Sequence, residues 1–99
     1  MRVALVTGGG SGIGRSAALE LNKIDFTVYV VGRREEELIK TTSLATNNNH
    51  KIIPIKTDIT IGSQVIALFD KIKSDHGRID LLFNNACLLY TSDAADESL

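Results

Sequence analysis

The sequence VTGGGSGIG (residues 6–14) joins an apolar run to a helical pattern through a turn rich in glycine. Glycine lets a backbone turn tightly and approach a ligand closely. The unpaired N–H groups at a helix start, together with the helix dipole, favour an anion at that point. The stretch therefore predicts a phosphate-binding loop, with a flexible turn that binds no ligand as the alternative.

Four apolar runs, rich in Val, Ile and Leu, are nearly continuous, which is typical of strands covered on both faces. They are RVALVT (2–7), TVYVV (27–31), KIIPIK (51–56) and IDLLFN (79–84). Between them lie three helical patterns: Ile13, Ala17 and Leu21 at a spacing of four, REEELIKTTSLAT (34–46), and SQVIALFDKIKSD (63–75), which Gly77 ends. The order β-α-β-α-β-α-β predicts an α/β fold, the N-terminal half of a Rossmann-type doubly wound parallel sheet.

Pro54 interrupts the third apolar run. Proline cannot donate to a strand ladder, so it is confined to edge strands. A Rossmann half-sheet of strand order 3-2-1-4 places the third strand at the edge. Both arguments predict the same position for this strand.

The composition limits the class of protein. The chain has 99 residues, a net charge of −1 and one cysteine, Cys87. We expect one small domain, no internal disulfide, and no nucleic acid or membrane surface as partner. No leader or membrane-spanning run is visible, so a cytoplasmic location is the default expectation. No pair of His, Cys, Asp or Glu has metal-ligand spacing, and no metal is expected.

Two phosphate-binding patterns compete in the glycine-rich stretch. Gly9-x-x-x-x-Gly14-Arg15-Ser16 is similar to a P-loop of a nucleotide triphosphatase, with Arg15 in place of the lysine that reaches the phosphates. Gly8-x-x-x-Gly12-x-Gly14 is instead a variant of the dinucleotide-binding fingerprint. The second pattern is favoured, because arginine does not replace the compact charge of that lysine.

Three motifs together resemble the short-chain dehydrogenase/reductase family. They are Thr7-Gly8-x-x-x-Gly12-x-Gly14, Asp58-Ile59-Thr60, and Asn84-Asn85-Ala86. The resemblance covers residues 1–86 and implies a nicotinamide dinucleotide cofactor. It places around that cofactor Thr7, Gly8, Gly10, Ser11, Gly12, Ile13, Gly14, Asp58, Ile59, Asn85 and Ala86, with Asp58 at the adenine and Asn85-Ala86 on the adenosine-ribose side. The alternative roles are structural: Asp58 could cap a turn, and Asn84 and Asn85 could satisfy backbone groups.

Arg33 and Arg34 follow the second strand, where NAD-binding proteins tend to place a carboxylate against the ribose 2′-hydroxyl. Gly32 occupies that region here, and guanidinium groups pair well with a 2′-phosphate. The sequence therefore favours NADP(H) over NAD(H), with Arg33 the stronger candidate. The alternative is that both arginines are solvated.

The tail, residues 87–99, departs from the family pattern, which has a glycine where Cys87 stands. CLLYTSDAADE (87–97) is one translation of TGT CTC TTA TAC ACA TCT GAC GCT GCC GAC GAR, which resembles a sequencing-library adapter. We expect residues 1–86 to be a truncated dinucleotide-binding half-domain and 87–99 to be non-native or disordered.

The family's catalytic Ser and Tyr-x-x-x-Lys pair are expected beyond residue 86. Tyr90 is followed four residues later by Ala94, and Ser92 has no base beside it. We therefore expect an oxidoreductase that transfers hydride between a nicotinamide cofactor and an alcohol/carbonyl substrate, whose present fragment is inactive. The parent could form homo-oligomers. The alternative is a non-catalytic dinucleotide-binding sensor of the same fold.

Overall fold

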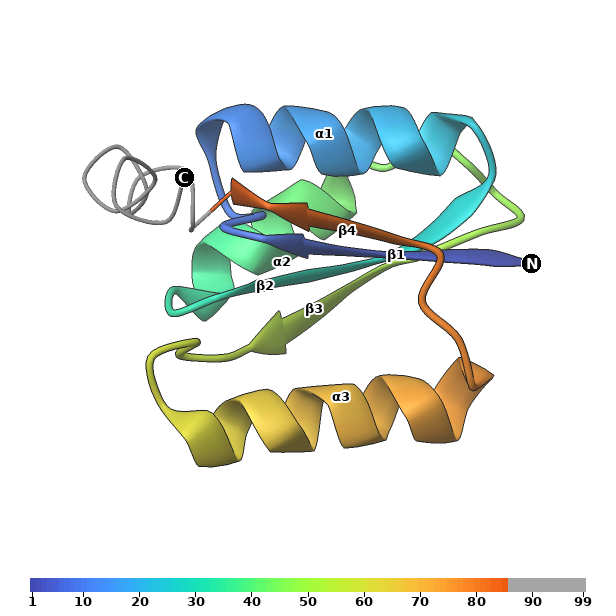
Figure 1. Ribbon diagram of the computed structural model, residues 1–99. Helices are drawn as coiled ribbons and strands as arrows, with labels where there is room; N and C mark the ends of the chain where they lie inside the picture. The colour runs from blue at the N-terminus through green and yellow to red at the C-terminus, as the bar shows by residue number, and fades with distance from the viewer. Residues whose placement is uncertain (86–99) are drawn as a thin grey trace, which may run out of the picture.

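The computed structural model describes residues 1–85, which form one parallel sheet with helices on both faces (Figure 1). The elements are β1 (Arg2–Thr7), α1 (Gly12–Lys23), β2 (Phe26–Gly32), α2 (Glu35–Ser43), β3 (Ile52–Lys56), α3 (Gly62–His76) and β4 (Leu81–Asn84). Every predicted element is present, although α2 ends at Ser43 rather than at 46. Ala86 and the predicted tail, 87–99, lie outside the described residues.

The strand order is β3-β2-β1-β4, and all three pairings are parallel, which confirms the predicted half-sheet. Thr7, the last residue of β1, is in register with Val31 of β2 and with Asn84 of β4. Figure 1 shows α1 and α2 on one face and α3 on the other. Because the chain reverses its direction along the sheet after β3, right-handed crossovers require this change of face.

Two hydrophobic cores explain why the apolar runs are continuous. Even-numbered residues of β1 and β2, such as Val6 and Val28, pack under α1 and α2 around Ala18 and Leu38. Odd-numbered residues pack under α3, in a cluster of Val3, Leu5, Tyr29, Val31, Leu68 and Ile72. Since successive side chains of a strand point to opposite faces, β1 and β2 must be apolar at both parities.

Pro54 lies in the edge strand β3, as predicted. The Val28 N–H donates to the Lys51 carbonyl at 3.0 Å, and the Thr57 N–H donates to the Gly32 carbonyl at 2.8 Å. Odd-numbered residues of this segment therefore bond to β2, because the inward-facing groups of a parallel strand alternate. The missing N–H of Pro54 is on the open side, where no ladder bond is lost.

The buried side of α1 centres on Gly14, Ala18 and Asn22. Ile13 is 64% exposed, whereas Gly14, Ala18 and Asn22 are buried. Gly14 lies so close to the end of β1 that it fixes the rotation of the helix, as shown below. The apolar spacing of four identified a helix but not its orientation.

Tyr29 anchors α3 to the sheet. Its ring is fully buried on β2, and its hydroxyl donates to Asp75 Oδ2 at 2.8 Å. The Lys71 ammonium bonds to the same carboxylate at 3.2 Å, and His76 packs edge-on to the tyrosine ring. The hydrogen bonds from Tyr29 and then Lys71 lower the pKa of Asp75, while burial and the neighbouring carboxylate raise the pKa of Tyr29.

This contact makes stability depend on pH. The contribution of Asp75 is present above the ordinary aspartate pKa, about 3.9, and is lost as pH falls through its lower folded-state pKa. We expect Asp75→Asn to lower the urea midpoint at pH 7 and to remove part of the loss of stability on acidification. Circular dichroism at a series of pH values measures both effects.

The matched control is Asp70→Asn, an exposed aspartate on the same helix. It should leave the midpoint and its pH profile nearly unchanged. Equal behaviour of the two variants would show that Asp75 does not anchor α3.

Candidate functional site

The turn after β1 is built on glycine. The N–H groups of Gly8 and Gly9 both donate to the Val31 carbonyl, at 2.9 and 3.3 Å, which carries the chain past the end of β2. Gly8 and Gly12 have φ values of 66° and 55°, in the left-handed region that other residues rarely adopt. The loop conformation therefore requires glycine at both positions.

Gly14 lets α1 begin directly beside the end of β1. A Cβ at this position would lie 2.0 Å from the Gly8 carbonyl oxygen. A Cβ at Gly9 would lie 2.6 Å from Cβ of Val30. The loop is thus pressed against β2 on one side and against the first turn of α1 on the other.

The start of α1 is open to a ligand. Ser11 is the N-cap in an extended conformation, and its side chain makes no capping hydrogen bond. Ser11, Gly12 and Ile13 are all exposed. Since the first N–H groups of a helix have no intrahelical acceptor, they remain available to an anion, which the dipole favours.

Thr7, Asn84 and Asn85 meet this loop at the point where the strand order reverses. The Thr7 hydroxyl donates to Asn84 Oδ1 at 2.8 Å, and Asn85 Nδ2 donates to the Gly8 carbonyl at 3.5 Å. Asn85 Nδ2 would lie 3.1 Å from a Cβ at Gly14. The structural alternative for the asparagines therefore holds at least in part, because both tie β4 to the glycine loop. Open α/β sheets bind ligands at such switch points.

Arg33 and Arg34 follow β2 and are exposed, with Arg34 at the N-cap of α2. Glu35, Glu36 and Glu37 occupy the first turn of α2. A Cβ at Gly32 would meet only the Leu38 side chain, at an ordinary 3.5 Å. Packing at Gly32 would therefore accept a Cβ atom.

Asp58 and Ile59 form a half-buried turn between β3 and α3. Asp58 Oδ1 accepts hydrogen bonds from the Thr60 hydroxyl at 2.6 Å and from the Thr60 N–H at 3.0 Å. These bonds, and the positive charge of Arg33 nearby, lower the pKa of Asp58 below its ordinary value. The turn-forming role of Asp58 is therefore real, and its carboxylate lies near Arg33.

Arg15 is engaged within the fold. Its Nε donates to the Thr41 hydroxyl at 2.9 Å, and its Nη2 donates to the carbonyls of Glu37, at 3.1 Å, and Gly10. Glu37 Oε2 lies 3.8 Å from the same nitrogen. A P-loop needs its cation directed at the phosphates, whereas this guanidinium is directed at α2 and at backbone carbonyls.

Sequence reasoning missed the role of α2 in supporting the glycine loop. The Thr41 hydroxyl donates to the Gly9 carbonyl at 2.7 Å, and the side chain is fully buried. A threonine in an amphipathic helix carries no motif. The one available signal was that Thr41 lies three residues after Leu38, on the same buried face.

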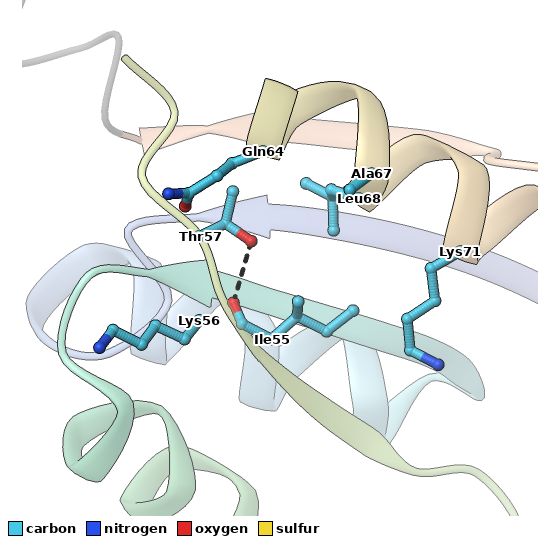
Figure 2. A pocket seen from close by; sticks show the side chains of 7 residues that line it. All are labelled: Ile55, Lys56, Thr57, Gln64, Ala67, Leu68 and Lys71. Carbon is cyan, nitrogen blue, oxygen red and sulfur yellow. Dashed lines mark hydrogen bonds between the residues drawn. The ribbon is translucent and has the colours of Figure 1, made fainter. Parts of the chain in front are cut away.

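A pocket of about 250 Å³ lies between the end of β3 and α3, away from the glycine loop. Figure 2 shows its lining, with Thr57 facing Gln64 and with Lys56 and Lys71 extending apart. None of the residues predicted to bind the cofactor lines it.

In the described part of the chain no helix could cross a membrane, and no cluster of three or more His, Cys, Asp or Glu residues could hold a metal ion.

Comparisons with known proteins agree with this geometry. The family model described as short chain dehydrogenase matches residues 2–99. Dehydrogenase/reductase SDR family member 1 of Mus musculus is 38% identical over 86 residues, which is 86% of this chain and 28% of that protein. The chain thus spans under a third of that relative's length.

Two solved structures share the fold. A metagenomic short-chain oxidoreductase in complex with NADP has a TM-score of 0.77 at 26% identity, over 82% of this chain and 37% of its own. A short-chain dehydrogenase/reductase from Burkholderia phymatum in complex with NAD has a TM-score of 0.75 at 31% identity, over 82% of this chain and 29% of its own. The two structures differ in the cofactor they hold.

The close contact at Gly14 can be tested by mutation. We expect Gly14→Ala to lower the free energy of unfolding by about 3 kcal/mol, because the added methyl group overlaps the Gly8 carbonyl. Urea unfolding followed by circular dichroism measures the change.

Gly62→Ala is the matched control, since nothing lies within 4 Å of a Cβ there. It begins α3, and alanine should be neutral or stabilising by up to about 1 kcal/mol. Similar effects of the two substitutions would contradict the close contact.

Proposed function

The chain belongs to the short-chain dehydrogenase/reductase family, and from this premise we propose that its described residues bind the adenosine and pyrophosphate part of NADP(H). The observation that carries the proposal is the open helix start at Ser11, held beside the Gly8 turn by Gly14. Backbone N–H groups and the helix dipole supply an anion site there without any side-chain charge.

The glycine loop would hold the pyrophosphate. Thr7 supports the loop by bonding to Asn84, and Gly8 and Gly12 give the backbone its course. The N–H groups nearest the open end belong to Gly10, Ser11, Gly12, Ile13 and Gly14. Ile13 is the exposed apolar side chain of this turn and would lie against the bound dinucleotide.

The preference for NADP(H) rests on Gly32, Arg33 and Arg34. A Cβ would fit at Gly32, so a clash at that atom does not explain why this position lacks the carboxylate typical of NAD-binding proteins. Arg33 is exposed beside the Asp58 turn, and Arg34 begins α2. A cation opposes the dipole at a helix start, and a 2′-phosphate between these guanidinium groups would compensate for it.

Asp58 and Ile59 would receive the adenine, with Asn85 and Ala86 on the adenosine-ribose side. Asp58 is held in place by Thr60 and keeps its ionised form to a lower pH than a free aspartate, because its pKa is lowered. Ala86 lies outside the described residues, so its part in the proposal rests on the family pattern alone.

For the whole protein we propose hydride transfer between the nicotinamide and an alcohol/carbonyl pair. The nicotinamide ring supplies or accepts the hydride when bound. Neither tyrosine, Tyr29 or Tyr90, has a lysine four residues later. We therefore expect the 99-residue chain to bind the cofactor without turnover, and oxidation of NADPH with ketones as substrates would contradict that expectation.

The cofactor preference is tested by isothermal titration of the 99-residue chain with NADPH and NADH. Replacing Arg33 by glutamine should weaken NADPH binding at least about tenfold, the loss expected for one charge-assisted hydrogen bond. NADH binding should stay nearly the same, since NADH has no 2′-phosphate.

Lys40→Gln is the matched control, because Lys40 is an exposed cation in the last turn of α2, far along the helix from Arg33 and Arg34. It should leave both affinities unchanged. Binding of NADH at least as tight as that of NADPH by the unaltered chain would overturn the NADP(H) preference, and binding of neither would overturn the proposed function.

A further inference from the structure

We propose that Thr41 and Arg15 are positioning residues for the cofactor. Their side chains hydrogen-bond the glycine loop to α2 and thereby direct the N–H groups of the loop toward the pyrophosphate. This inference rests on the proposed function. It concerns two side chains that lie outside the glycine motif and would not touch the ligand.

The first contact holds the Gly9 carbonyl. The Thr41 hydroxyl is fully buried on α2 and has two acceptors, the Gly9 carbonyl at 2.7 Å and the Glu37 carbonyl at 3.2 Å, of which the Gly9 carbonyl is the nearer. The same hydroxyl accepts the Arg15 Nε–H at 2.9 Å. One threonine thus bonds to the loop and to the first turn of α1 at once.

The second contact holds the next carbonyl. Arg15 Nη2 donates to the Gly10 carbonyl and also, at 3.1 Å, to the Glu37 carbonyl in the first turn of α2. A Cβ at Gly10 would lie 3.0 Å from Cβ of Glu37. The loop and the helix are therefore in direct contact, and Gly10 allows the approach.

The hydrogen bonds to the Gly9 and Gly10 carbonyls also determine where the next N–H groups of the loop point. In a trans peptide the C=O and the following N–H point in opposite directions. If the carbonyls of Gly9 and Gly10 point at α2 and Arg15, the N–H groups of Gly10 and Ser11 point away from them. Ser11 is exposed, so a ligand can reach this part of the loop.

The hydrogen bonds of Thr41 and Arg15 also connect the proposed pyrophosphate site at the glycine loop with the helix beside the proposed 2′-phosphate site. Glu37 lies one turn beyond Arg34, the N-cap of α2, so these contacts join the loop to the helix that follows the arginine pair. The contacts hold the loop, and the arginine pair keeps its place at the end of β2 without them. Neither residue contributes charge or a donor directly to the ligand in this account.

The test compares Thr41→Val with Thr41→Ser in the 99-residue chain. Valine keeps the shape and removes the hydroxyl, whereas serine keeps the hydroxyl. We expect the valine variant to bind NADPH about tenfold more weakly, as loss of a buried hydrogen bond implies, and the serine variant to stay within about twofold.

The readout that separates positioning from mere structural support is adenosine 2′-monophosphate, which carries the 2′-phosphate and lacks the pyrophosphate. Titration followed by amide NMR shifts should give an unchanged affinity for this nucleotide in both variants. Equal weakening of both ligands, or unchanged NADPH binding by the valine variant, would overturn the inference while the proposed function stands.

If the unaltered chain binds neither ligand, the proposed function and this inference both fail. If the valine variant does not fold by circular dichroism, Arg15→Met and Arg15→Lys take its place, because lysine keeps one donor for the Gly10 carbonyl. Methionine should then weaken NADPH binding more than lysine does, and equal NADPH affinities would overturn the inference.

Discussion

The approach of Gly14 to the Gly8 carbonyl is the constraint on which the rest of the structure depends. A Cβ at Gly14 would lie 2.0 Å from that oxygen, so the first turn of α1 lies directly against the end of β1. This contact sets the rotation of α1, buries Ala18 and Asn22, and leaves Ile13 exposed. It also places an uncapped helix start at the carboxyl edge of the sheet, where strand order reverses and ligands bind in such folds.

The site combines backbone donors with cations from a neighbouring element. The loop carries no charge of its own, since its contribution comes from N–H groups and the dipole of α1. Arg33 and Arg34 supply positive charge at the end of β2, and the charge of Arg33 acts on the Asp58 carboxylate. Solved structures with this fold hold NADP in one case and NAD in another. Under the proposed function the loop would serve either cofactor, and the end of β2 would discriminate between them.

Much of the fold followed from the sequence, because parallel strands covered on both faces leave continuous apolar runs and Pro54 marks an edge. The glycine loop was predictable for a different reason: its backbone angles require glycine, so the glycines show in the sequence. The buried side of α1 could not be read from the apolar spacing, because the contact of Gly14 with the Gly8 carbonyl sets the rotation of the helix. The roles of Thr41 and Arg15 were not visible either, because they depend on contacts between residues far apart in the chain.

Amide NMR shifts of the 99-residue chain during titration with NADPH test the central claim most directly. We expect saturable shifts at the amides of residues 10–14, which form the open helix start, together with shifts at Arg33, Arg34 and Asp58. The first group reports the pyrophosphate and the second reports the 2′-phosphate and adenosine. Saturable shifts confined to other surfaces, or none at the amides of residues 10–14, would contradict the claim that this helix start holds the cofactor.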